Sequence, residues 1–338
     1  MTPGGAGVRR HDHQTTQADL TAGAVLAPYL QEQAAEFLRS LRLHRENSAP
    51  TDAGTHGAEE AAGALRRSSR RIGGTLHTFR VALDAAWAEQ LRTELAWLSG
   101  TLAREHAYAT RLGRLLEALH SLSGTSLPTA RNGVGADRAA DKERAALGVG
   151  AARAGALLER QLTLARTRAH SAALQALGSS RFHAVADAVA LLASEVPLAP
   201  AAAAPAEEML HGPADRAEQH LLTAVAALSC DQAEPYNEAQ DAPWHRTRLL
   251  LRLHRYAHEV VRGAPDPVLA APGRALDLHR DASEAAAAAA SAARTPRIAP
   301  ATAYALGVLH ADQRHEVKTA RGVFRASWPY TAAAVTGP

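Results

Sequence analysis

Apolar residues recur along this chain at helical spacing, in stretches separated by proline and glycine. Near the N-terminus, Leu26, Leu30 and Leu41 share a face with Phe37. Most apolar residues are alanine and leucine, which lose little side-chain freedom in a helix, whereas aromatic residues make up only 4% of the chain. The β-branched and aromatic residues that strands prefer are sparse. The sequence therefore predicts an all-α protein.

The breaks between these stretches predict the order of the helices and loops. We expect helices at about 26–41, 58–83, 86–100, 102–122, 145–177, 180–194, 206–228, 244–262, 274–294 and 302–325. Polar loops are expected at 46–57, 124–141 and 231–243. The resulting division is a disordered tail at 1–18, a first helical bundle at 19–195, a Pro/Ala linker at 196–205, a second bundle at 206–326 and a C-terminal tail at 327–338.

Several classes of protein are disfavoured by what the sequence lacks. Cys230 is the single cysteine, so an intramolecular disulfide and a cysteine-rich metal site are excluded. The polar N-terminus has no apolar core of a signal peptide, and no stretch of about 18 apolar residues could span a membrane. We expect a cytoplasmic protein without membrane association.

The basic residues are more informative by type and position than by number. All but two of the 37 are arginine, although the formal net charge is only +3. An arginine fork can chelate two phosphate oxygens. With about 100° per residue, one stripe of about 80° holds Arg66, Arg70, His77 and Arg80. A second stripe of about 100° holds His245, Arg248, Arg252, Arg255, Tyr256 and Glu259.

Such stripes are often solvated faces, but a stable solvated face usually mixes charge signs. In the second stripe Glu259 is the one acidic residue among the cations. Like charges one turn apart cost stability, so an external polyanion is a simple explanation for the missing negative charge. The implied ligand carries many phosphates and needs no aromatic stacking.

The residues of both stripes resemble the two repeat motifs of CHAD domains (conserved histidine α-helical domains). The second motif is matched by the segment 244–248, by Arg252 and by the segment 255–259. The first is echoed by Arg66, by 70–72 and by 75–80. The resemblance extends over roughly residues 19–325, with the family's opening helix at 22–30 and its middle helix at 177–192.

This resemblance implies a fold and a function. The fold is two pseudo-symmetric four-helix bundles that form one unit with a basic central channel. The function is non-catalytic binding of inorganic polyphosphate, without cofactor or metal, and with polyphosphate granules as an expected location. The implied ligand-binding residues are Arg66, Arg70, Arg71, His77, Arg80, His245, Arg246, Arg248, Arg252, Arg255 and Tyr256. The histidines are expected to strengthen binding below about pH 6.5.

The sequence also departs from the family pattern, mostly in the first half. Gly63 stands where the first motif usually has its histidine, and Gly73 where another base is usual. The segment 106–109, His-Ala-Tyr-Ala, replaces a usual Arg-Asp-x-Asp, and 309–313 only loosely matches the last helix. These departures leave open a scaffold whose channel is degenerate.

Two other functions remain as alternatives. Arginine-rich helices could bind nucleic acid non-specifically, although aromatic residues for base stacking are scarce and no specific nucleic-acid motif is present. A dimetal four-helix site is suggested by Glu117 with His120 and by Glu208 with His211, because both pairs have carboxylate–histidine spacing. Gly212 and Pro213 directly after His211 argue against the second pair. Protein partners are not indicated by the sequence.

Overall fold

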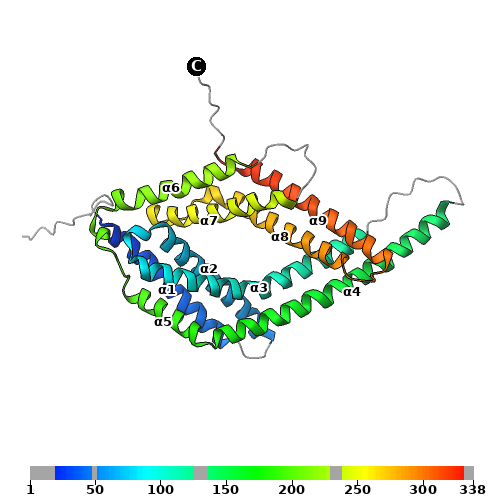
Figure 1. Cartoon of the computed structure of the whole chain (residues 1–338), viewed down its shortest axis with the longest axis horizontal. Helices are drawn as coiled ribbons and strands as arrows, with labels where there is room; N and C mark the ends of the chain where they lie inside the picture. The colour runs from blue at the N-terminus through cyan, green and yellow to red at the C-terminus, as the bar shows by residue number, and fades with distance from the viewer. Residues whose placement is uncertain (1–19, 48–51, 125–135, 229–237, 331–338) are drawn as a thin grey trace, which may run out of the picture.

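The computed structural model describes residues 20–47, 52–124, 136–228 and 238–330, which form an elongated, all-helical molecule (Figure 1). Its α-helices are α1 (Ala22–Glu46), α2 (Asp52–Thr78), α3 (Ala85–Gly124), α4 (Ala136–Leu177), α5 (Ser180–Ser194), α6 (Ala206–Ala226), α7 (Asp241–Arg262), α8 (Ala270–Ala293) and α9 (Pro300–Ser327). Within these residues the β structure is limited to two isolated bridges. None of the described helices is both long and apolar enough to cross a membrane. The prediction of an all-α chain is confirmed.

Helical periodicity placed most elements correctly. The predicted helix 180–194 coincides with α5, and Leu26, Leu30 and Phe37 of α1 are completely buried, as their shared face requires. α7 ends at Arg262 because Gly263 adopts a left-handed conformation, with φ of 71°, that caps the helix. The expected tail at 1–18 and Cys230 lie outside the described residues.

Several predicted breaks are wrong. The helices expected on either side of Gly100 are one continuous helix, α3. Gly100 lies on the exposed side of α3, and packing along the other side outweighs the modest helix penalty of one glycine. Residues 136–141, predicted as loop, already belong to α4, and Asp241, also predicted as loop, begins α7.

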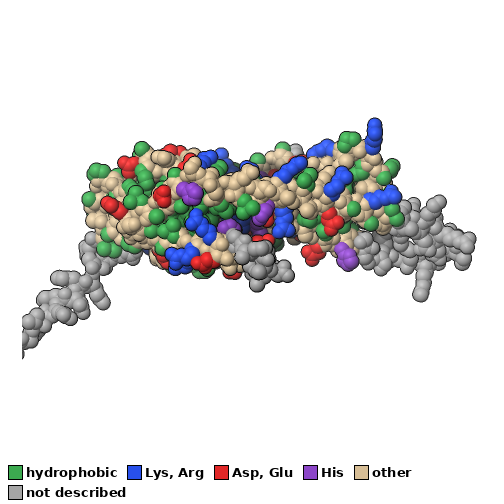
Figure 2. Space-filling model, turned by 90° about the horizontal axis from the view of Figure 1, so that it is seen from below, with side chains coloured by type: hydrophobic (Ala, Val, Ile, Leu, Met, Phe, Trp, Pro, Cys, Tyr) green, Lys and Arg blue, Asp and Glu red, His purple; other side chains and the backbone are tan. Residues whose placement is uncertain are grey.

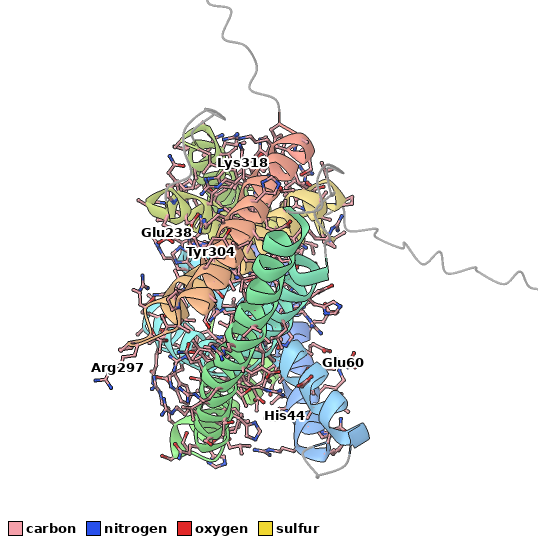
Figure 3. All side chains as sticks on the ribbon, turned by 90° about the vertical axis from the view of Figure 1, so that its right-hand side faces the viewer. His44, Glu60, Glu238, Arg297, Tyr304 and Lys318 are labelled. Atoms are coloured by element: carbon pink, nitrogen blue, oxygen red, sulfur yellow. The ribbon has the colours of Figure 1, made fainter. Side chains whose placement is uncertain are left out.

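The hydrophobic core does not divide at the predicted linker. One cluster combines α1, α2, α3 and α5 with residues of α6 and α7, including Leu210 and Val260. A second joins α3 and α4 to α8 and α9, and Figure 3 shows α4 crossing close to α9. A third packs α6, α7, α8 and α9 around Trp244. Two of the three clusters therefore combine helices from both sides of 196–205.

The segment 196–205 is itself packed against the first half of the chain. It contains the short 3-10 helix η3 (Pro200–Ala203), in which Ala202 is buried. Its backbone forms hydrogen bonds to the first residue of α1 and to the segment before α3: Ala22 N donates to Ala204 O (2.9 Å), and Ala199 N donates to Ala82 O (3.0 Å). The segment is therefore held against the first half of the chain, and its role as a domain boundary stays a prediction.

Candidate polyanion-binding cleft

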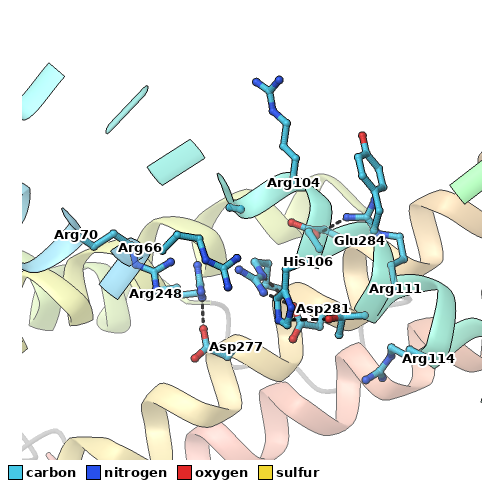
Figure 4. A pocket seen from close by; sticks show the side chains of 15 residues that line it. Arg66, Arg70, Arg104, His106, Arg111, Arg114, Arg248, Asp277, Asp281 and Glu284 are labelled. Atoms are coloured by element: carbon cyan, nitrogen blue, oxygen red, sulfur yellow. Dashed lines mark hydrogen bonds and ion pairs between the residues drawn. The ribbon is translucent and has the colours of Figure 1, made fainter. Parts of the chain in front are cut away.

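A cleft of about 500 Å³ lies between α2 and α3 on one side and α7 and α8 on the other (Figure 4). Figure 1 shows these helix pairs in two layers that extend along the molecule. The charged side chains that line the cleft are seven arginines and three carboxylates: Arg66, Arg70, Arg104, Arg111, Arg114, Arg248, Arg280, Asp277, Asp281 and Glu284. On the face shown in Figure 2, by contrast, basic and acidic side chains are scattered among one another.

Three of the predicted binding residues meet in this cleft. Arg66 and Arg70 occupy successive turns of α2, so both project from the same side of that helix. Arg248 enters from α7 and lies beside them in Figure 4. Stripes that are 182 positions apart in the sequence therefore face one cavity.

The two cleft arginines of α2, Arg66 and Arg70, lack a carboxylate partner among the described residues. The Nε atoms of Arg66 and Arg70 are buried and have no hydrogen-bond partner there. Burial lowers the pKa of Arg66, and the positive charges of Arg70, Arg67 and Arg280 lower it further. Burial also lowers the pKa of Arg70. These guanidinium groups are held in a partly desolvated site without neutralisation, which is unfavourable unless an anion binds there.

Arg252, one turn beyond Arg248 on α7, lies next to the cleft lining and not in it, and it too has no carboxylate partner among the described residues. Burial, followed by repulsion from Arg248, lowers the pKa of Arg252 to about 10. The negative charge of Asp277 opposes this shift without forming an ion pair with Arg252. Arg252 therefore adds a third cation without a carboxylate partner in the described chain.

The other wall of the cleft is neutralised by carboxylates of α8. Asp277, Asp281 and Glu284 follow one another at spacings of four and three residues, so they share one face of that helix. Arg248 Nε donates to Asp277 (2.5 Å), and Arg111 Nη2 donates to Glu284 (2.5 Å). Arg280 donates to Asp281 through Nε (2.9 Å). Each carboxylate thus holds a different cleft arginine.

Sequence reasoning missed the contributions of α3 and of Arg280. Arg104, Arg111 and Arg114 fall on one side of α3, at spacings of seven and three residues. Arg114 Nε donates to Gln313 of α9 (2.5 Å), which orients that side chain. The same helical-face test that identified the α2 and α7 stripes would have found the α3 row, because all three arginines lie within the predicted helix 102–122.

The segment that departs from the family pattern forms part of the cleft wall. His106, Ala107 and Tyr108 all line the cavity. Burial lowers the pKa of His106, and the positive charge of Arg66 lowers it further, so this imidazole is neutral near pH 7. The ring of Tyr108 lies against Arg111, with 5.5 Å between the guanidinium carbon and the ring centroid.

Two predicted binding residues, Arg71 and Tyr256, instead connect helices. Arg71 donates to Glu259 through Nε (2.9 Å) and Nη2 (3.3 Å), and Tyr29 of α1 also donates to Glu259 (3.0 Å). Tyr256 packs between Arg71 and Gly74. Glu259, the acidic residue of the predicted α7 stripe, thus binds Arg71 and Tyr29 and not the stripe arginines Arg252 and Arg255.

His77 and Arg80 lie outside the cleft lining. α2 ends at Thr78, and Arg80 begins the 3-10 helix η2 (Arg80–Ala82), so Arg80 does not continue the helical stripe. His77 is largely exposed. Its partial burial lowers its pKa, and the charges of Arg92 and Arg80 lower it further. The predicted four-residue stripe therefore contributes two residues, Arg66 and Arg70, to this cavity.

The remaining predicted residues of α7 lie beside the cleft lining. His245 is exposed and packs edge-on against His279 of α8, at 5.4 Å between ring centroids. Arg246 is exposed as well. The Nε atom of Arg255 is buried without a hydrogen-bond partner in the described chain, and its guanidinium lies over Gly273.

The alternative of a dimetal site gains no structural support. Among the described residues, histidine, cysteine and carboxylate side chains do not gather in groups of three or more that could hold a metal ion. Glu117 and His120 lie on α3, whereas Glu208 and His211 lie on α6.

Comparison with known proteins identifies the family. A model described as "CHAD domain" matches residues 32–280, which contain α2, α3, α7 and, of the cleft-lining residues of α8, Asp277 and Arg280. The chain belongs to the CHAD domain family. The CHAD-type fold predicted from the motifs is thereby confirmed, and the pseudo-symmetric arrangement of two four-helix bundles stays a prediction.

Two solved structures are similar to this CHAD protein. PptA from Streptomyces chartreusis is 58% identical, with a TM-score of 0.76 and coverage of 92% of this chain and 100% of PptA. The CHAD domain from the plant Ricinus communis has a TM-score of 0.59 at 19% identity, covering 97% of this chain and 99% of the plant domain. The second similarity shows the fold alone. No curated protein matches the chain.

Proposed function

We propose that this CHAD protein binds inorganic polyphosphate in the cleft between α2, α3, α7 and α8, and that it acts as a binding module and not as an enzyme. The observation that carries the proposal is the group formed by Arg66, Arg70 and Arg252. These three cations are partly buried and have no carboxylate partner among the described residues. The family resemblance implies the same ligand.

The chemistry of the lining suits a chain of phosphates. Each phosphate presents oxygens that match a guanidinium fork, and a linear polymer can contact successive arginines without paying the association entropy again. Arg248 and Arg280 extend the row beyond Arg66 and Arg70. We propose these residues and Arg252 as the central contacts, with His77, Arg80, His245, Arg246 and Arg255 as outer contacts for a longer chain.

The cleft suits nucleic acid less well. Tyr108 is the aromatic side chain of the lining, and Arg111 already covers its ring. Single-stranded nucleic acids usually gain affinity by stacking bases on free aromatic faces. Polyphosphate requires no such face. A degenerate scaffold is likewise disfavoured, because Arg66 and Arg70 of the divergent first motif face Arg248 of the second in one cavity.

The test is calorimetric titration of medium-chain polyphosphate into the full chain at low and moderate salt. We expect tight binding that weakens steeply with salt, because charge neutralisation releases counterions. Arg252→Ala should weaken binding by about tenfold or more, the loss expected for a hydrogen bond to a charged group. Arg168→Ala removes an exposed arginine of α4, outside the cleft lining, and provides the matched control.

Two outcomes would contradict the proposal. The first is an absence of polyphosphate binding at low salt, which would favour the scaffold. The second is equal loss from Arg252→Ala and Arg168→Ala, which would indicate attraction by net charge without a defined site. Competition by duplex DNA at equal phosphate concentration distinguishes the nucleic-acid alternative, and we expect polyphosphate to bind more tightly.

A further inference from the structure

We propose that Glu259 is a positioning residue for the cleft, which fixes the spacing between α2 and α7 through Arg71, Tyr29 and Tyr256. The inference rests on the proposed function, because the spacing that it concerns is the one between the two arginine rows. Glu259 does not line the cleft itself. Its effect on the ligand would be exerted through the helices that carry Arg66, Arg70, Arg248 and Arg252.

Glu259 joins three helices at one buried point. Its side chain is only 7% exposed, and it accepts hydrogen bonds from Tyr29 of α1 and from Arg71 of α2. The hydrogen bond to Glu259 raises the pKa of Arg71, and burial, followed by the charge of Glu259, raises the pKa of Tyr29. Arg71 therefore stays charged and Tyr29 stays a neutral donor near pH 7.

Beside this junction, α2 and α7 approach so closely that glycine is required. A Cβ atom at Gly74 would lie 2.7 Å from Cδ2 of Tyr256 and 3.3 Å from Cδ2 of Leu253. The face of the Tyr256 ring lies against Arg71, with 5.8 Å between the guanidinium carbon and the ring centroid. The ring thus contacts both Gly74 and Arg71 of α2 and acts as a spacer between the helices.

The arginines that α2 and α7 carry at the cleft make an attachment between the two helices necessary. Arg70 on α2 repels Arg248 and Arg252 on α7, and this repulsion favours separation of the two helices when no anion is bound. Among the described residues, Arg71 with Glu259 is the ion pair that connects α2 to α7. It lies within a turn of Arg70 on α2 and two turns beyond Arg252 on α7.

The proposal predicts that neutralisation of Glu259 weakens polyphosphate binding, whereas charge repulsion alone predicts stronger binding. A carboxylate near a polyanion site would ordinarily weaken binding by repulsion, so its neutralisation would tighten binding. If Glu259 instead positions the rows, Glu259→Gln should weaken binding although the protein becomes more positive. Tyr29→Phe removes one donor and leaves both charges, so a smaller loss in the same direction is expected.

Gly74→Ala tests the spacing without any change of charge. The added methyl must displace Tyr256, and we expect medium-chain polyphosphate to bind about tenfold more weakly. Gly73→Ala is the matched control on the same helix, because nothing lies within 4 Å of the position of its Cβ atom. This control should bind like the wild-type protein.

The titration separates positioning from partial unfolding. A smaller folded fraction lowers the apparent stoichiometry and leaves the Kd of the folded molecules unchanged, whereas altered spacing raises the Kd. Pyrophosphate, with two phosphates, should lose less affinity than the long chain. The inference is overturned if Glu259→Gln tightens binding, or if Gly74→Ala raises the Kd no more than Gly73→Ala. If the wild-type protein itself binds no polyphosphate, the proposed function fails first.

Discussion

The two walls of the cleft hold their arginines in opposite ways. On the side of α2, Arg66 and Arg70 have no described carboxylate partner, nor does Arg252 of α7 next to the lining, and burial lowers the pKa of all three. On the side of α8, a row of carboxylates holds Arg280 of that helix, Arg248 of α7 and Arg111 of α3. The first, unneutralised wall retains an unfavourable electrostatic energy that a bound anion can relieve, whereas these arginines of the second, neutralised wall are already paired.

This difference indicates that the two walls contribute differently to phosphate binding. The unneutralised wall should supply most of the affinity for phosphate, because binding there breaks no internal ion pair. At the neutralised wall, phosphate competes with carboxylates that are tethered next to the arginines and therefore present at high effective concentration. Acidic residues around the cleft should accordingly have opposite effects: those of α8 compete with the ligand, whereas Glu259 organises the site.

The largest effect is expected from removal of the unneutralised wall. The double variant Arg66→Ala, Arg70→Ala should lose about 3–6 kcal/mol of polyphosphate binding energy, or at least about 100-fold in Kd, because each charge-assisted contact contributes about 1.5–3 kcal/mol. Without ligand the same variant should unfold at a higher temperature, since two partly buried like charges are gone. Calorimetry and thermal unfolding measure both changes. A loss of affinity no larger than that caused by Arg111→Ala would contradict the proposed difference between the two walls.

Neutralisation of the three α8 carboxylates should instead strengthen polyphosphate binding. The triple variant Asp277→Asn, Asp281→Asn, Glu284→Gln is expected to bind polyphosphate about tenfold more tightly, as removal of nearby like charges contributes roughly 1 kcal/mol or more in total. The triple variant Glu36→Gln, Glu89→Gln, Glu94→Gln is its control, because it removes three carboxylates that pair with arginines outside the cleft. Equal tightening by both variants would mean that net charge alone matters.

A pH dependence should identify the histidine that contacts the ligand. Burial and Arg66 keep the pKa of His106 below its usual value in the free protein, although Glu59 and Asp281 oppose this shift. A bound polyanion favours the protonated ring, so affinity should rise as pH falls below about 6.5. His106→Gln should remove most of this rise. His77→Gln should remove little, because His77 lies outside the cleft lining, and the reverse result would place the ligand along the outer residues.

The smallest effect concerns the helix that carries the missed arginines. Gly100→Ala adds a methyl to an open position inside α3 and should stabilise the protein by about 0.5–1 kcal/mol. Chemical denaturation measures this gain. Polyphosphate affinity should not change, because α3 is already continuous past Arg104, and a changed Kd would indicate that α3 bends at Gly100 in the free protein.

The sequence by itself determined the helical class, the CHAD family and three of the seven arginines that line the cleft. These depend on local regularities: apolar residues at helical spacing, and Arg66, Arg70 and Arg248 at fixed positions in two motifs. Helix ends were less predictable, because a single glycine such as Gly100 carries a penalty that tertiary packing outweighs. The end of α2 at Thr78 likewise removed Arg80 from the predicted stripe.

Only the tertiary structure decided which charges are neutralised. Arg71 and Arg70 are adjacent in the sequence, yet Arg71 turns to Glu259 and Arg70 turns to the cleft. Asp277 and Glu284 gave no signal, because a carboxylate on a helix reveals neither its partner nor its exposure until another helix packs against it. Which side chains form ion pairs depends on how α2, α3, α7 and α8 pack against one another. The spacing of residues along one helix carries no information about that packing.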